Sequence, residues 1–175
     1  MSCCVENDGS TLKVTLTFKR DQLLYDIKNY AYVESHVMPP DTEHAKHMVA
    51  DVGEEGNVDR VTRVLDLGVS MCMEMLYPWA KKDIVNTELD DTLEERQQYV
   101  IVMNVPTTMS ETTLTLVERQ IHEYLVCRGV ADWMSITNAQ KAETWLAKAA
   151  EAESEIRVAI HSRMQRTRIR QHFLD

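Results

Sequence analysis

Residues 57–78, NVDRVTRVLDLGVSMCMEMLYP, decide the fold class. Apolar residues recur here at intervals of three and four, which is the spacing of one face of an α-helix. Asn57 is a good helix N-cap and Pro78 interrupts helices, so the pattern predicts a helix over residues 58–77. A wide apolar stripe is typical of a central helix. The stripe comprises Val58, Val61, Val64, Leu65, Leu67, Gly68, Met71, Cys72, Met75 and Leu76.

Three further segments show the same helical periodicity. The first covers residues 20–38 and ends at two prolines, and another covers about residues 112–135. Thr137 and Gln140 have the spacing of a capping box, which predicts a last helix from residue 138 to about residue 172. Such a helix would be roughly 50 Å long at 1.5 Å per residue, longer than one domain of this size needs.

Two segments alternate between apolar and polar residues and predict β-strands near residues 11–18 and 99–105. Two strands alone make a weak sheet, so either helices support them or another copy of the protein completes the sheet. The second strand is apolar on both faces. One of its faces is expected to meet either the core or a neighbouring subunit, and it is our candidate oligomer interface: Tyr99, Ile101, Met103 and Val105.

The sequence therefore predicts a mainly α fold, a helical bundle with a long C-terminal helix and a small two-stranded β element, at the margin of α+β. The predicted organisation is a flexible N-terminus (residues 1–10), a single helical domain (residues 11–160) and a basic C-terminal arm (residues 161–175). At 175 residues, with 44% hydrophobic and 27% charged residues, the chain suits one globular domain.

Compartment and membrane association follow from what the sequence lacks. No apolar run approaches the roughly 18 residues that span a bilayer, and the first ten residues do not resemble a secretory signal. Cys3, Cys4, Cys72 and Cys127 have no disulfide or zinc spacing, which favours free thiols in a reducing compartment. We expect no membrane contact and no cofactor.

Catalytic signatures are equally sparse, and we expect a protein that is not an enzyme. His122 and Glu123 begin like a zinc-protease motif, but position 126 is Val where the second ligand should stand. His44 and His47 lie one turn apart on a possible short helix. A metal site needs three or four converging ligands, so these residues are interpreted as surface or interface groups and no metal site is assigned.

Charge is unevenly distributed along the chain, whose formal net charge is −9. Residues 41–95 contain fourteen acidic and five basic residues, whereas residues 161–175 contain four arginines, two histidines and one aspartate. Three explanations stay open: complementing a helix dipole, binding nucleic acid, or docking on an acidic protein surface. We favour docking. The candidate anchors are Arg163, Arg166, Arg168, Arg170 and Phe173, and the candidate receptors on a neighbour are Glu88, Asp90, Asp91, Glu94 and Glu95.

The helix order resembles that of helical head–tail connector (adaptor) proteins from the neck of tailed phages. The resemblance lies in residues 56–79, GNVDRVTRVLDLGVSMCMEMLYPW, and residues 113–133, TLTLVERQIHEYLVCRGVADW, followed by a terminal helix with a basic tail. It covers roughly residues 20–80 and 110–175 and rests on helix order and apolar pattern rather than on an invariant motif. The two predicted strands depart from the compact helical pattern of that family.

This resemblance implies a structural virion protein, assembled in the host cytoplasm, that forms a ring in the neck, usually a dodecamer. Such a ring lies between portal and tail, lets DNA pass through its channel without sequence-specific binding, and sends terminal arms into the adjoining ring. Two other functions stay open from the sequence. One is a nucleic-acid-binding regulator that uses the basic C-terminal helix, and the other is a metal-dependent hydrolase that uses His44, His47, His122 and Glu123.

Overall fold

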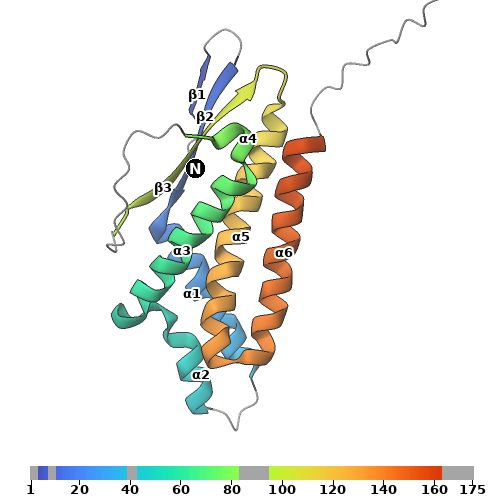
Figure 1. The fold of residues 1–175 in the computed structure, drawn as a ribbon. Helices are drawn as coiled ribbons and strands as arrows, with labels where there is room; N and C mark the ends of the chain where they lie inside the picture. The colour runs from blue at the N-terminus through green and yellow to red at the C-terminus, as the bar shows by residue number, and fades with distance from the viewer. Residues whose placement is uncertain (1–3, 8–10, 39–42, 83–94, 163–175) are drawn as a thin grey trace, which may run out of the picture.

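A computed structural model describes residues 4–7, 11–38, 43–82 and 95–162, which form a small antiparallel sheet at one end of a set of helices (Figure 1). The strands are β1 (Cys4–Asn7), β2 (Thr11–Lys19) and β3 (Gln98–Pro106). The helices are α1 (Arg20–Val37), α2 (Glu43–Ala50), α3 (Glu55–Met75), α4 (Tyr77–Ala80), α5 (Glu111–Thr137) and α6 (Ala139–Ser162), with a 3-10 turn, η1, at Asp51–Gly53. The predicted fold class, mainly α with a small β element, is confirmed.

The sheet has three strands in the order β1-β2-β3, one more than the sequence predicts. Both predicted strands are present. The prediction of a flexible segment over residues 1–10 is wrong for four of them, because Cys4 to Asn7 pair with β2 opposite Thr15 to Leu12. Their short sequence gives no alternating pattern, whereas pairing depends on backbone N–H and C=O groups whatever the side chains are.

One face of the sheet lies in the hydrophobic core. The β2–β3 register places Leu16 opposite Ile101 and Phe18 opposite Tyr99, and all four side chains are buried. β2 leads directly into α1, and the backbone N–H of Arg20 donates to the carbonyl oxygen of Gln97, 3.1 Å away. The sheet therefore fixes where α1 begins and the direction in which it leaves the sheet.

α5, rather than α3, is the most deeply buried helix among the described residues. α3 begins at Glu55, not at Val58, and the side-chain amide of Asn57 donates to the carbonyl oxygen of Asp51 instead of capping the helix. Leu67, predicted to belong to the α3 stripe, is 56% exposed. α5 buries side chains around most of its circumference: Thr113, Leu114, Val117, Glu118, Ile121, Tyr124, Leu125, Val126, Cys127, Val130, Ala131, Trp133 and Met134.

A single residue, Asn138, joins α5 to α6, which lie side by side as a helical hairpin (Figure 1). Its backbone N–H donates to the carbonyl oxygen of Met134, and its own carbonyl oxygen accepts from the N–H of Lys141, so one residue ends α5 and opens α6. The predicted capping box at Thr137 does not form, because the Thr137 hydroxyl donates to the carbonyl oxygen of Trp133, 3.0 Å away. The predicted continuation of α6 towards residue 172 lies outside the described residues.

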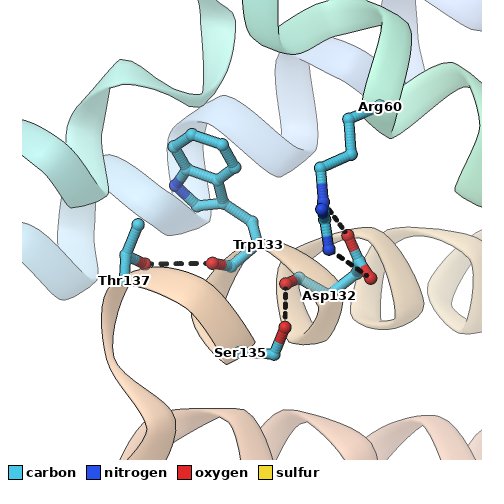
Figure 2. Close-up of polar contacts among 5 residues, drawn as sticks. All are labelled: Arg60, Asp132, Trp133, Ser135 and Thr137. Carbon is cyan, nitrogen blue, oxygen red and sulfur yellow. Dashed lines mark hydrogen bonds and ion pairs between the residues drawn. The ribbon is translucent and has the colours of Figure 1, made fainter.

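Neighbouring residues of α5 hold it to two other helices, and Figure 2 shows the first of these contacts, between Arg60 and Asp132. The guanidinium of Arg60 on α3 binds the Asp132 carboxylate through Nε at 2.7 Å and Nη2 at 3.2 Å. The Asp132 hydrogen bond and charge raise the pKa of Arg60, but the pair is solvent-exposed and contributes about 1 kcal/mol or less. The indole N–H of buried Trp133 donates to the carbonyl oxygen of Val49 on α2, 2.8 Å away. This second contact fixes α2 against the hairpin.

Candidate functional site

The outward face of α1 carries large side chains but little charge. We define the α1 face as Tyr25, Asn29, Tyr32, Val33, His36 and Val37. Four of these are exposed hydrophobic or aromatic residues: Tyr25 is 64% exposed, Tyr32 56%, Val33 50% and Val37 69%. From Asn29 to the end of α1, none of the exposed residues is Asp, Glu, Lys or Arg.

The α1 face follows from how little of α1 is buried. Beyond its first residue, α1 buries Leu23, Ile27, Ala31 and Ser35, which recur every four residues and form one narrow row. The opposite side of the helix therefore points into solvent for more than three turns. Exposed helix surfaces normally carry charged residues, whereas the centres of protein–protein interfaces are depleted of charge and enriched in tyrosine. We identify the α1 face as the candidate contact surface.

On one side of the α1 face, α1 and α2 enclose a surface hollow of about 330 Å³, which we call the α2 hollow. It is lined by Tyr32, Ser35 and His36 from α1 and by Lys46, His47 and Ala50 from α2. His36 is fixed on α1, because its Nδ1 lies 2.9 Å from the carbonyl oxygen of Tyr32 and its ring is 4.1 Å from the Tyr32 ring. Among the described residues, the lining includes a lysine and two histidines but no carboxylate.

On its other side, α1 packs against α6. The rings of Tyr30 and Trp145 are 4.9 Å apart, and the Lys141 ammonium lies 3.0 Å from the Glu34 carboxylate. The negative charge of Glu123 on α5 is the main cause of a raised pKa at Tyr30. The side of α1 that faces α6 is therefore packed against neighbouring helices, and the Glu123 carboxylate lies near Tyr30 in this contact.

The groove between α5 and α6 holds a second surface hollow, of about 440 Å³, which we call the α6 hollow. Three of its lining residues are acidic, Glu123, Glu151 and Glu155, and the others are Gln120, Lys148 and Ala152. The single lysine is already engaged, because its ammonium lies 3.9 Å above the centre of the Trp145 ring. The α6 hollow is therefore acidic, whereas the α2 hollow is basic.

His122, one of the residues considered as metal ligands, belongs to the α1–α5 contact. Its Nε2 lies 2.8 Å from the Asp26 carboxylate, which also accepts from the Gln22 side-chain amide. These three residues line a cavity of about 540 Å³ together with Thr17, Phe18, Lys19 and Gln98. Nowhere in residues 4–7, 11–38, 43–82 and 95–162 do three metal-binding side chains converge.

The strand face proposed as an oligomer interface lies inside the molecule. Tyr99, Ile101, Met103 and Val105 are each no more than 2% exposed and belong to the hydrophobic core of their own chain. The assignment of these residues to an interface is therefore wrong, and the alternative, a face that meets the core, is correct. The sequence alone could not distinguish the two, because a core and a subunit interface both require an apolar strand face.

The predicted acidic receptors lie mostly outside the described residues. Among them Glu95 is described, and it is exposed with its carboxylate 3.8 Å from the guanidinium of Arg20. Glu88, Asp90, Asp91 and Glu94 lie outside the described residues, as do all five predicted anchors, Arg163, Arg166, Arg168, Arg170 and Phe173. Their pairing stays a prediction.

Two predicted free thiols, Cys72 and Cys127, are buried. Burial raises the pKa of each thiol to about 12, and the negative charges of Glu153 and Glu123 add to the rise at Cys72 and Cys127 respectively. Because the thiolate is the reactive form, we expect neither residue to be alkylated by iodoacetamide at about pH 8 while the protein is folded. Mass spectrometry of the digested protein measures this, and both should react after unfolding. Rapid labelling of either in the folded protein would contradict the structure.

No family model, curated protein or solved structure matches the chain. None of the helices within the described residues is long and apolar enough to cross a membrane.

The α1 face and the two hollows were not identified from the sequence, although part of the signal was present. Projecting residues 20–37 on a helical wheel places Tyr25, Asn29, Tyr32 and His36 together, opposite the row of Leu23, Ile27 and Ala31. A tyrosine-bearing outer face, without charged residues from Asn29 onward, was therefore visible. The two hollows were not, because each needs a second helix whose position no local pattern gives.

Proposed function

We propose that the protein is a non-enzymatic structural subunit that assembles into a ring, as the head–tail connectors of tailed phages do. In that role it would lie in the virion neck between portal and tail and surround the DNA without reading its sequence. The observation that carries the proposal is the α1 face, a tyrosine-bearing helix surface without fixed charge on a chain of net charge −9.

The polar groups of the described interior support a structural role. His122 and Asp26 join α5 to α1, and Trp133 joins α5 to α2. Arg20, buried at the start of α1, donates to the Thr62 hydroxyl on α3, 3.0 Å away. Each of these groups links two helices, which is the arrangement expected of a rigid subunit that must present fixed surfaces to its neighbours.

The C-terminal arm supplies the second part of the proposal. Its arginines are suited to bidentate pairing with carboxylates, and in the proposed assembly they anchor the subunit on an adjoining protein of the neck rather than on residues 88–95 of another copy. The arm and the α1 face then have separate tasks. The folded body makes the ring, and the arm attaches the ring to the next component.

The mass and shape of the purified protein test this proposal. We expect light scattering to give a discrete oligomer and electron microscopy of that species to show a closed ring with a central opening. A chain that ends at Ser162 should still form the ring, because the arm is assigned to attachment and not to ring contacts.

Two results would overturn the proposal. One is a monomer at every concentration from micromolar to millimolar, and the other is an oligomer that never closes. If the shortened chain alone fails to assemble, the assignment of the arm to attachment is wrong, while ring formation by the full chain stands.

A further inference from the structure

We propose that the basic surface around the α2 hollow of one copy contacts the acidic surface around the α6 hollow of the next copy. This contact repeats around the ring. The inference rests on the proposed function, which requires self-association, and it names the two surfaces that meet. The occupant of the α2 hollow is a second copy of this chain.

The basic partner of this contact is the α2 hollow. Lys46 and His47 from α2 and His36 from α1 line it, together with Tyr32 and Ser35. The Ser35 hydroxyl and His36 Nδ1 are engaged with the Tyr32 carbonyl oxygen, which leaves Lys46 and His47 to meet a ligand. No described carboxylate lines the hollow, so a carboxylate of a second copy can pair with Lys46 there.

The acidic partner is the α6 hollow. Glu151 and Glu155 are exposed and lie one helical turn apart on α6, and no described residue forms an ion pair with either. Glu123 lies beside them from α5. Three carboxylates with one engaged lysine give this surface a net negative charge, which complements the α2 hollow.

The positions of the two hollows suit a head-to-tail contact. α1 lies between them, because it packs against α6 through Tyr30 and Glu34 and lines the α2 hollow through Tyr32 and His36. Copies placed side by side in one orientation therefore bring a basic side against an acidic side at every junction. Repetition of one such contact closes a ring when the rotation between neighbours allows it.

Electrostatics also selects this arrangement over its alternatives. Two copies that met through their α6 hollows would place six glutamates together, and like charges across an interface disfavour the wrong pairing. The uncharged α1 face lies beside both hollows and supplies apolar area that can be covered when neighbours meet. The contact would then bury apolar side chains beside its charged groups, as protein interfaces commonly do.

Charge reversal at the two hollows tests the contact, with the concentration dependence of mass measured by sedimentation velocity. Lys46→Glu and Glu151→Lys are each expected to weaken self-association about tenfold or more. The two changes combined in one chain should recover part of it, because positions 46 and 151 then carry opposite charges again. Arg63→Glu and Glu74→Lys on the exposed side of α3 change the net charge by the same amounts and should have little effect.

The outcomes separate this inference from the proposed function. If the wild type forms rings that neither reversal weakens, or if the α3 controls weaken them equally, the two hollows are not the contact and the ring proposal stands. If the wild type never associates, both fall. Circular dichroism and thermal unfolding of every variant show that each is folded before its mass is interpreted, so loss of association is not confused with loss of structure.

Discussion

Replacing Trp133 by Ala is expected to lower the free energy of unfolding by about 3–5 kcal/mol, the largest single effect we predict. The indole is 5% exposed and lies where α5 meets α2, so its removal leaves a cavity between two helices. It also takes away the N–H that donates to the Val49 carbonyl oxygen. Urea unfolding followed by circular dichroism measures the change.

Trp133→Phe separates the two contributions. Phe keeps most of the apolar volume but has no N–H, so the loss should fall to about 1–3 kcal/mol, the cost of leaving one buried acceptor without its donor. Hydrogen exchange should then increase in α2 more than in α6, because the lost bond holds α2 alone. Equal losses for Ala and Phe would show that packing at this position matters little and that the hydrogen bond dominates.

Replacing Ile101 by Ala is expected to lower the free energy of unfolding by about 2–5 kcal/mol, because the side chain is fully buried between sheet and helices. Its neighbour on the same strand, Val102, points to the other face and is half-buried. Val102→Ala should therefore cost about 1 kcal/mol or less. Unfolding measurements on the two variants compare the two faces of β3 directly.

The same two variants decide between a core and an interface. A core position loses stability in the isolated chain, whereas an interface position changes the mass of the assembly at constant stability of the subunit. If Ile101→Ala reduced the oligomer mass and left the unfolding of the subunit unchanged, the inner face of β3 would be a subunit contact and the fold described here would be wrong at this strand.

Local periodicity was enough to predict most of the secondary structure. The alternation over residues 11–18 and 99–105 and the helical spacing from Leu114 to Trp133 each appear in the sequence as they do in the structure. In these segments hydrophobic burial and local propensity favour the same element. β1 was missed because its only support is pairing with β2, which is a contact between segments.

Boundaries and long-range contacts were harder to predict for the same reason. Asn57 has the chemistry of a cap, yet its amide reaches the Asp51 carbonyl oxygen, because η1 brings that oxygen within 2.9 Å. The His122–Asp26 pair joins residues 96 positions apart, and nothing local to either residue indicates the other. His122 was interpreted as a surface or interface group, whereas the structure places it largely buried against α1.

The sequence predicted the type of contact, docking between oppositely charged surfaces, but not the residues of the candidate site. Charge asymmetry along the chain led to an expectation of docking between unlike charges, with the basic partner in the arm and the acidic partner in residues 88–95. The described residues carry a second and independent asymmetry, between Lys46 on α2 and Glu151 on α6. The sequence alone does not show it, because Glu123 belongs to α5 and only folding brings it beside Glu151 and Glu155 of α6.

The connection at Asn138 limits how this protein can change in length. Since a helix advances about 100° per residue, one extra residue there would turn α6 by more than a quarter of a revolution about its own axis. Trp145, Ala149 and Ala152, now buried, would rotate away from the core, and Glu151 would leave its hollow. Insertions that many proteins accept in their loops would here alter the core and the outer surface in one step. The structure therefore constrains the number of residues that can connect α5 to α6.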